Sequence, residues 1–219
     1  MDNQSQIIDQ ISFMDYVQAG IKLKMEVAID FSDKNGKLGK EGCLHNFNEK
    51  GTNDYEIGIK YCCSILSQYD YEKAFKVYGF NAIINKEKNP NPCFNITLDE
   101  NMELKSVAEI AEAYKRLLPR IKLGNPNYLT PLMQKYIDLI TTENNMMIYH
   151  ILIIFTNGHI KDMETTVSKV VEASHLPLSI IMIGIGEEEF PKLEFLDSDN
   201  ALLCDSKGEV AERDIVQFV

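Results

Sequence analysis

The residues with the clearest chemical potential lie where an apolar segment gives way to a polar loop. A buried strand leading into that loop is predicted by the run Met25-Glu-Val-Ala-Ile-Asp30-Phe-Ser32-Asp-Lys34. Asp30 and Ser32 offer the hard oxygen atoms that divalent metal ions prefer. Lys34, a cation, stands where a third metal ligand would be expected. The function of the protein therefore depends on whether this loop still holds a metal ion.

Strand and helix signals alternate along the chain. Apolar segments typical of strands occur at 23–29, 74–84, 149–155 and 178–183, with a short one at 202–203. Helical patterns occur at 55–69, 102–118, 130–143, 162–173 and 210–219. Thr130 is predicted as an N-cap followed by Pro131, and Asp162 as the cap of the next helix.

This alternation predicts an α/β fold, a doubly wound and mostly parallel sheet with helices on both faces. Ligands of such sheets bind at the carboxyl ends of the strands. Asp30 and Asn157 both follow predicted strands, so we expect these two residues to meet at that edge although they are far apart in sequence.

Composition and charge restrict the class of partner. The 219 residues suit one domain, and a net charge of −11 with a pI near 4.9 argues against binding to nucleic acid or anionic lipid. A basic cluster of Lys34, Lys37 and Lys40 departs from that trend. The apolar runs are too short to cross a bilayer, and the start of the chain lacks a signal-peptide pattern. The lack of a signal-peptide pattern and the odd count of five cysteines together predict a cytoplasmic protein with reduced thiols.

Several motifs, in order and at consistent spacing, resemble the von Willebrand A domain of copines. The resemblance covers residues 12–219, so residues 1–11 are interpreted as a polar N-terminal extension. The motifs that carry it are Ser12-Phe-Met-Asp-Tyr-Val-Gln-Ala-Gly20, the strand to Asp30, Leu44-His45, Tyr78-Gly-Phe80, Ala113-Tyr114, Leu117-Leu118-Pro119, Thr156-Asn-Gly158, Ala173-Ser-His-Leu-Pro-Leu-Ser-Ile180 and Arg213-Asp-Ile-Val-Gln-Phe218.

The resemblance implies a doubly wound sheet with a metal-ion-dependent adhesion site at its top edge. In the family pattern, the first loop reads Asp-x-Ser/Thr-x-Ser, the second supplies Thr and the third supplies Asp. Mapped position by position, the first loop keeps Asp30 and Ser32 but carries Lys34, while Asn127 replaces the Thr and Asn157 the Asp. Copines usually carry paired calcium-dependent lipid-binding domains before this one, and the chain is expected to be an excised domain or a reduced member of the family.

Two of the three replacements, Lys34 and Asn157, change the charge of the site. The usual pair of carboxylates contributes −2, whereas Asp30 and Lys34 here sum to 0. Our hypothesis is that the Lys34 ammonium lies near the vacant metal position, pairs with Asp30 and contacts the amide oxygens of Asn127 and Asn157. One alternative is that Lys34 points into solvent. Another is weak binding of magnesium or manganese through Asp30, Ser32 and the two asparagines, so no cofactor is firmly assigned.

The predicted function is that of a non-enzymatic protein-interaction module in calcium- and phospholipid-linked signalling or membrane trafficking. A protein partner would bind the top face through an acidic group, with Lys34, Lys37, Tyr128 and His159 as candidate contacts. Neither nucleic acid nor direct membrane contact is expected. The alternatives are magnesium-dependent binding at a weakened site, or a hydrolase that uses Asp30. The hydrolase has the weaker basis, because no second catalytic group is evident near Asp30.

Overall fold

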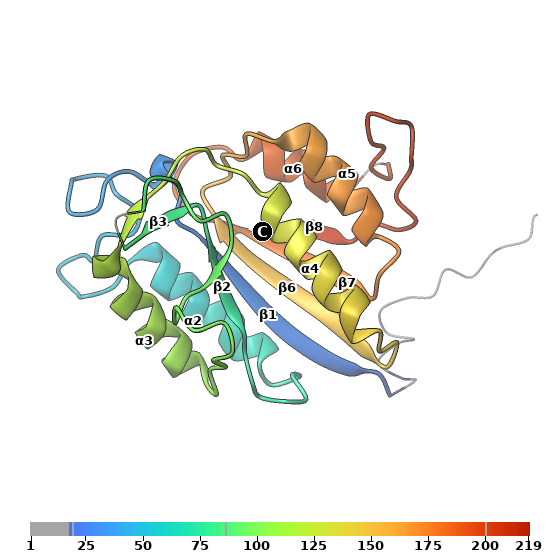
Figure 1. Cartoon of the computed structure of the whole chain (residues 1–219), viewed down its shortest axis with the longest axis horizontal. Helices are drawn as coiled ribbons and strands as arrows, with labels where there is room; N and C mark the ends of the chain where they lie inside the picture. Colours follow the sequence, from blue (N-terminus) through green and yellow to red (C-terminus); the bar gives the residue numbers. More distant parts are fainter. Residues whose placement is uncertain (1–17, 19, 86, 200) are drawn as a thin grey trace, which may run out of the picture.

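The structure is a computed structural model, and it describes residues 18, 20–85, 87–199 and 201–219. The predicted boundary between residues 11 and 12 lies outside the described residues. Within them, a six-stranded sheet has the order β4-β2-β1-β6-β7-β8 (Figure 1). All neighbouring strands pair in parallel except β2 and β4. The strands of this sheet are β1 (Lys22–Asp30), β2 (Val77–Phe80), β4 (Phe94–Asn95), β6 (Ile148–Thr156), β7 (Leu178–Gly184) and β8 (Val216–Phe218).

Helices cover both faces of the sheet, as the sequence predicted (Figure 1). The helices α2 (Asp54–Leu66) and α3 (Val107–Leu117) pack on one face. The helices α4 (Thr130–Glu143), α5 (Met163–Ala173) and α6 (Pro191–Asp197) pack on the other. A separate two-stranded ribbon joins β3 (Ala82–Ile84) to β5 (Ile121–Leu123), and single 3-10 turns occupy Asp33–Asn35 and Leu118–Arg120.

Alternation along the central strands divides the interior into two cores. In β1, Val27 and Ile29 face α2 and α3, whereas Ala28 between them faces the opposite helices. In β6, Ile153 and Leu152 are divided in the same way. Because both faces of a central parallel strand are buried, much of its sequence is apolar, as at 27–29 in β1 and 151–155 in β6, which explains why these strands were predictable.

The pairing of β1 with β6 sets the geometry of the site. Their parallel register runs from Lys22 opposite Ile148 to Ile29 opposite Phe155. The last residue of β1, Asp30, therefore lies at the same edge of the sheet as Thr156, the last residue of β6. This edge also receives the loops that follow both strands.

The strand predicted at 74–84 is two strands rather than one. Asn81 has φ of +64°, in the left-handed region, and it separates β2 from β3. Asparagine tolerates this conformation better than most residues. The kink removes β3 from the main sheet and pairs it with β5 instead.

Two helix predictions also need correction. The helix expected at 102–118 begins only at Val107, because Leu104 exchanges backbone hydrogen bonds with Phe75 and Ser106 then caps the helix. The C-terminal segment 210–219 contains the strand β8 and not a helix, since Val216–Phe218 pairs with β7. The strand expected at 202–203 is absent from the described fold, while α6 was not predicted.

The predicted helix at 55–69 exists, but its buried face is a different one. Ile57, Tyr61 and Ile65 show helical spacing, yet they are 39%, 71% and 60% exposed. The side chains that pack against the sheet include Tyr55 and Ile59, which are fully buried. Two apolar stripes run along α2, and packing on the sheet selects between them. Among the described residues, no helix combines the length and apolar character needed to cross a membrane.

Candidate functional site

Asp30 lies at the centre of the site and is almost completely buried, at 1% exposure. Its Oδ1 accepts a hydrogen bond from the Ser32 backbone N–H at 2.8 Å. Its Oδ2 accepts one from the Thr156 hydroxyl at 2.9 Å. Burial raises the pKa of the Asp30 carboxyl, while hydrogen bonds from Ser32, Thr156 and Asn157 oppose that rise. Both carboxyl oxygens thus have partners within the protein.

Ser32 and Asn157 join the same hydrogen-bonded cluster. The Asn157 amide nitrogen donates to the Ser32 hydroxyl oxygen at 3.1 Å, and its amide oxygen accepts from the His159 backbone N–H at 2.9 Å. The structure therefore brings together three of the residues that the sequence placed at the site. The role of Thr156 was missed, although the residue was visible in the third loop.

Lys34 does not pair with Asp30 in this structure. The lysine is exposed, and no ion pair or side-chain hydrogen bond involves it among the described residues. The expected pair is absent because the carboxylate is buried and both its oxygens are already in use. Lys34 instead lines a cavity of about 250 Å³. The other residues around this cavity are Asn125, Asn127, His159, Ile160, Lys161 and Lys192.

Asn127 belongs to the cavity rather than to the Asp30 cluster. Its side chain is buried, at 7% exposure, and neither its amide nitrogen nor its amide oxygen has a partner in the described structure. Its backbone carbonyl accepts from the Lys161 N–H at 2.9 Å, which fixes the two loops relative to each other. The predicted contacts from Lys34 to Asn127 and Asn157 are likewise not formed.

The remaining candidate contacts are distributed around this edge. His159 lines the cavity, and its Nε2 lies 3.9 Å from the Glu188 carboxylate. Tyr128 is 40% exposed and lines a neighbouring hollow. Lys37 is exposed but does not line the cavity. Asp33, in the first loop, accepts a hydrogen bond from the Asn125 amide at 2.9 Å.

A buried polar network supports the first loop from below. The backbone carbonyl of Asp30 accepts from His45 Nε2 at 2.9 Å, so His45 Nδ1 is free to accept from the Tyr114 hydroxyl at 2.8 Å. Asn53 donates to the His45 carbonyl at 2.8 Å and caps α2 by accepting from the Glu56 N–H. Burial lowers the pKa of His45 to about 3, which keeps the ring neutral.

Aromatic stacking holds the His45 ring in this position. Its centroid lies 4.2 Å from the Tyr55 ring and 5.1 Å from the Phe31 ring. Asn35 completes the support, because its amide donates to the Asp30 carbonyl and its oxygen accepts from Tyr55 at 2.6 Å. Sequence spacing gave no indication of this network, since its members come from four separate segments.

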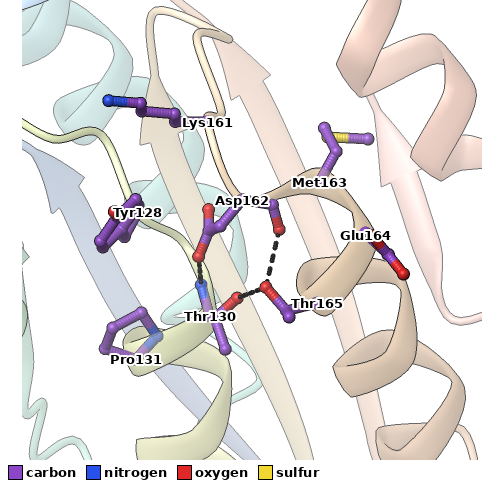
Figure 2. Close-up of a pocket in the computed structure, with 8 residues that line it drawn as sticks. All are labelled: Tyr128, Thr130, Pro131, Lys161, Asp162, Met163, Glu164 and Thr165. Atoms are coloured by element: carbon purple, nitrogen blue, oxygen red, sulfur yellow. Dashed lines mark hydrogen bonds between the residues drawn. The ribbon is translucent and has the colours of Figure 1, made fainter.

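Asp162 fixes the loop that carries Asn127. The sequence predicted that it caps its own helix, α5, but its carboxylate instead accepts from the backbone N–H of Leu129 at 2.9 Å. It also accepts from the backbone N–H of Thr130 at 2.9 Å (Figure 2). Helix α4 therefore receives its N-terminal acceptor from another loop. Thr130 is the first residue of α4 and not its N-cap.

Replacing Asp162→Ala is expected to lower the free energy of unfolding by about 1 kcal/mol, because two N–H groups at the start of α4 lose their acceptor. Urea denaturation of the variant measures this loss. The matched control is Glu164→Ala, which removes an exposed carboxylate from the first turn of α5. Equal stability of the two variants would show that the Asp162 contacts do not stabilise the helix.

Comparison with known proteins places the chain in a family. The Copine family profile matches residues 43–219. Two proteins called nicotinic receptor-associated protein 1 match 98% of the chain, at 35% identity in Caenorhabditis briggsae and 34% in Caenorhabditis elegans. The chain covers 34% of each, so it spans about a third of the length of these relatives.

Solved structures show the same fold at low sequence identity. The manganese-loaded TRAP protein of Plasmodium vivax superposes with a TM-score of 0.55 at 9% identity, covering 91% of this chain and 69% of that one. The SpRpn10 VWA domain gives a TM-score of 0.52 at 12% identity, covering 91% and 87%. The family profile extends over most of the sequence and the fold agrees with these structures, so this chain belongs to the copine family and has the fold of a von Willebrand A domain.

Proposed function

We propose that this domain is a non-enzymatic protein-interaction module that binds an acidic group of a partner at the carboxyl edge of its sheet, without a bridging metal ion. One observation carries the proposal. Lys34 lines a cavity with Lys161 and Lys192, and no Asp or Glu is among the described residues that line it. In a protein with a net charge of −11, this local excess of positive charge favours an anionic partner group.

The donor set at Asp30 fits a divalent cation poorly. Magnesium requires near-octahedral coordination by oxygen atoms. Asp30 is the single carboxylate of its hydrogen-bonded cluster, and both its oxygens accept hydrogen bonds. The Asn157 amide nitrogen donates to the Ser32 hydroxyl oxygen, so a donor occupies a lone pair that a metal would need. We interpret this arrangement as an adhesion site in which hydrogen bonds replace the metal.

The same geometry argues against hydrolysis at Asp30. A catalytic carboxylate requires access to its substrate and a group positioned for proton transfer. The Asp30 carboxyl is buried, and the nearby imidazole of His45 contacts its backbone carbonyl, not its side chain. Burial also keeps the His45 ring neutral. These contacts give Asp30 a structural role in our proposal, as the anchor of the first and third loops.

The family suggests the setting in which the module acts. The relatives in Caenorhabditis are named for association with a nicotinic receptor, and they are about three times longer than this chain. We infer that the domain binds a protein partner at the cytoplasmic face of a membrane, in calcium- and phospholipid-linked signalling or membrane trafficking. Any lipid contact would come from calcium-dependent lipid-binding domains outside this chain.

Metal-independent binding to an acidic peptide tests the proposal. A fluorescent peptide that contains a run of Glu and Asp is titrated with the domain, in EDTA and again in millimolar magnesium. We expect equal affinity in both buffers, and a loss of about tenfold or more for Lys34→Glu, because a cation facing the ligand becomes an anion. The matched control is Lys50→Glu, which reverses an exposed lysine that does not line the cavity.

The alternatives predict different results. If binding requires magnesium and EDTA abolishes it, the weakened metal site is functional and the proposal is wrong. Equal losses for Lys34→Glu and Lys50→Glu would show that net charge, and not the cavity, attracts the peptide.

A further inference from the structure

The cavity beside Lys34 has the chemistry of an oxyanion site. Three lysines, Lys34, Lys161 and Lys192, line this cavity of about 250 Å³. Two carboxylates lie behind the lining: Asp33 accepts from the Asn125 amide through one oxygen, and Glu188 lies 3.9 Å from His159, but neither residue lines the cavity itself. The Lys192 ammonium donates to the Ile160 carbonyl, which holds it at the rim of the cavity. The residues that line the site therefore carry an excess of positive charge, with one of the three ammonium groups held in place by a backbone carbonyl.

Asn127 supplies an independent sign that a ligand binds here. Buried polar side chains nearly always have hydrogen-bond partners, and leaving one without a partner costs about 1–3 kcal/mol. Asn127 is more than nine-tenths buried, lines the cavity, and lacks a partner for both polar atoms of its side chain among the described residues. A ligand oxygen in the cavity would accept from its amide nitrogen.

Size and charge favour a phosphoryl group over a carboxylate. Pockets for drug-sized ligands have volumes of roughly 300–1,000 Å³, so this cavity suits a single small group. A carboxylate carries one negative charge, whereas a phosphomonoester carries about −1.5 to −2 and offers three acceptor oxygens. The lysines and Asn127 supply several N–H donors to the lining of this cavity, which matches three oxygens better than two.

A second hollow beside this cavity indicates that the phosphoryl group belongs to a polypeptide. This hollow has a volume of about 600 Å³ and shares Lys161 with the first. Figure 2 shows Tyr128 and Pro131 on one side of it and Met163 on the other. These apolar side chains suit a side chain that neighbours the phosphorylated residue. Glu164 also lines the hollow and disfavours a second acidic residue there.

We propose that the carboxyl edge of this domain binds a phosphorylated side chain of a protein partner, with the phosphoryl group held by Lys34, Lys161, Lys192 and the Asn127 amide. An apolar residue next to the phosphorylated one would lie in the hollow between Tyr128 and Met163. This inference rests on the proposed function and specifies the acidic group that the domain recognises.

Calorimetric titration with matched peptides tests this inference. A 12-residue peptide with one phosphoserine beside a leucine is compared with the same peptide carrying serine or glutamate at that position, all in EDTA. We expect the phosphopeptide to bind at least tenfold more tightly than the glutamate peptide, and the serine peptide to show no saturable binding. Lys192→Ala and Asn127→Ala are each expected to weaken phosphopeptide binding about tenfold, and Lys50→Ala to leave it unchanged.

The outcomes separate this inference from the proposed function. Equal affinity for the glutamate and phosphoserine peptides, reduced by Lys34→Glu, would retain the acidic-group proposal and overturn the phosphoryl preference. If neither the glutamate peptide nor the phosphoserine peptide binds, both the acidic-group proposal and the phosphoryl preference are wrong. Inorganic phosphate or vesicles with anionic phospholipid that bind as tightly as the phosphopeptide would show that a peptide is not the ligand. Folding of Asn127→Ala is checked by its circular dichroism, and Lys192→Ala, at an exposed position, provides a second test.

Discussion

The triple variant Lys34→Ser, Asn127→Thr and Asn157→Asp is expected to bind magnesium and manganese saturably at millimolar concentrations or below, whereas the natural sequence is expected to show no such binding. The substitutions restore the residue types of the copine adhesion site and change the formal charge of the site from 0 to −2. Each restored unit of charge adds about 8 kcal/mol of gross attraction to a divalent ion at 4 Å and an effective dielectric of 20. Desolvation offsets much of this gain. Isothermal titration with magnesium, manganese and calcium measures the result.

Contacts and charge explain the expected effects at Asn157 and Lys34. Asn157 now donates to the Ser32 hydroxyl oxygen, and an aspartate there would accept from that hydroxyl and leave an oxygen lone pair for the metal. Lys34→Ser alone removes the cation but adds no carboxylate, so weaker binding is expected. Adding Asp30→Ala to the triple variant should abolish the signal. A triple variant that folds but binds no metal would show that these residues do not correspond to the adhesion site.

The variant His45→Phe is expected to lower the free energy of unfolding by about 2 kcal/mol at pH 7, and by close to zero at pH 5. A phenyl ring preserves the stacking between Phe31 and Tyr55 but loses the hydrogen bonds to the Asp30 carbonyl and the Tyr114 hydroxyl. Both groups keep one other partner, Asn35 and Asn53 respectively, which limits the loss at neutral pH.

The pH dependence follows from the position of His45 in the interior. Burial lowers its pKa from an ordinary 6.5 to about 3, so between these values the unfolded chain binds a proton that the folded protein does not. Stability from this group is therefore present above pH 6.5 and is lost as the pH falls toward 3. At pH 5 the loss is about 2 kcal/mol, given 1.36 kcal/mol per pKa unit. The phenylalanine variant lacks this loss.

Urea denaturation of both proteins at pH 5 and pH 7 measures the effect. Comparing the two proteins at each pH cancels the contributions of Asp30 and of other titrating groups to first order. The control is His175→Phe, because the His175 imidazole is exposed and pairs with the exposed Glu212. A stability difference between wild type and His45→Phe that is unchanged from pH 7 to pH 5 would contradict a neutral, buried His45.

Periodicity in the sequence determined the main layers of this protein. The strands β1, β6 and β7 were predictable because the two faces of a central parallel strand are covered, which favours short apolar runs such as those at 27–29, 151–155 and 180–183. The alternation of such runs with helical patterns predicted the doubly wound sheet. The placement of Asp30 and Asn157 at one edge followed from that topology, and the hydrogen bonds through Ser32 connect the two residues as expected.

Short elements and helix ends depended on partners that are distant in sequence. Asn81 separates β2 from β3, which the sequence pattern predicted as a single strand. Leu104 pairs with Phe75 where a helix was expected. The C-terminal strand forms because β7 offers a free edge, which a local pattern does not reveal. Likewise, α4 begins at Thr130 because Asp162 from another loop accepts from its first N–H groups.

The amino-acid sequence by itself determined the fold class, the family and the charge change at Lys34, because each depends only on residue type and order. The tertiary structure alone decided where that charge acts. Asp30 is buried with both carboxyl oxygens in use, so Lys34 does not pair with it and instead lines a cavity with Lys161, Lys192 and the unpartnered Asn127. The physical reason is that a buried carboxylate takes the nearest hydrogen-bond donors, and those donors come from two loops that meet only when the sheet has formed.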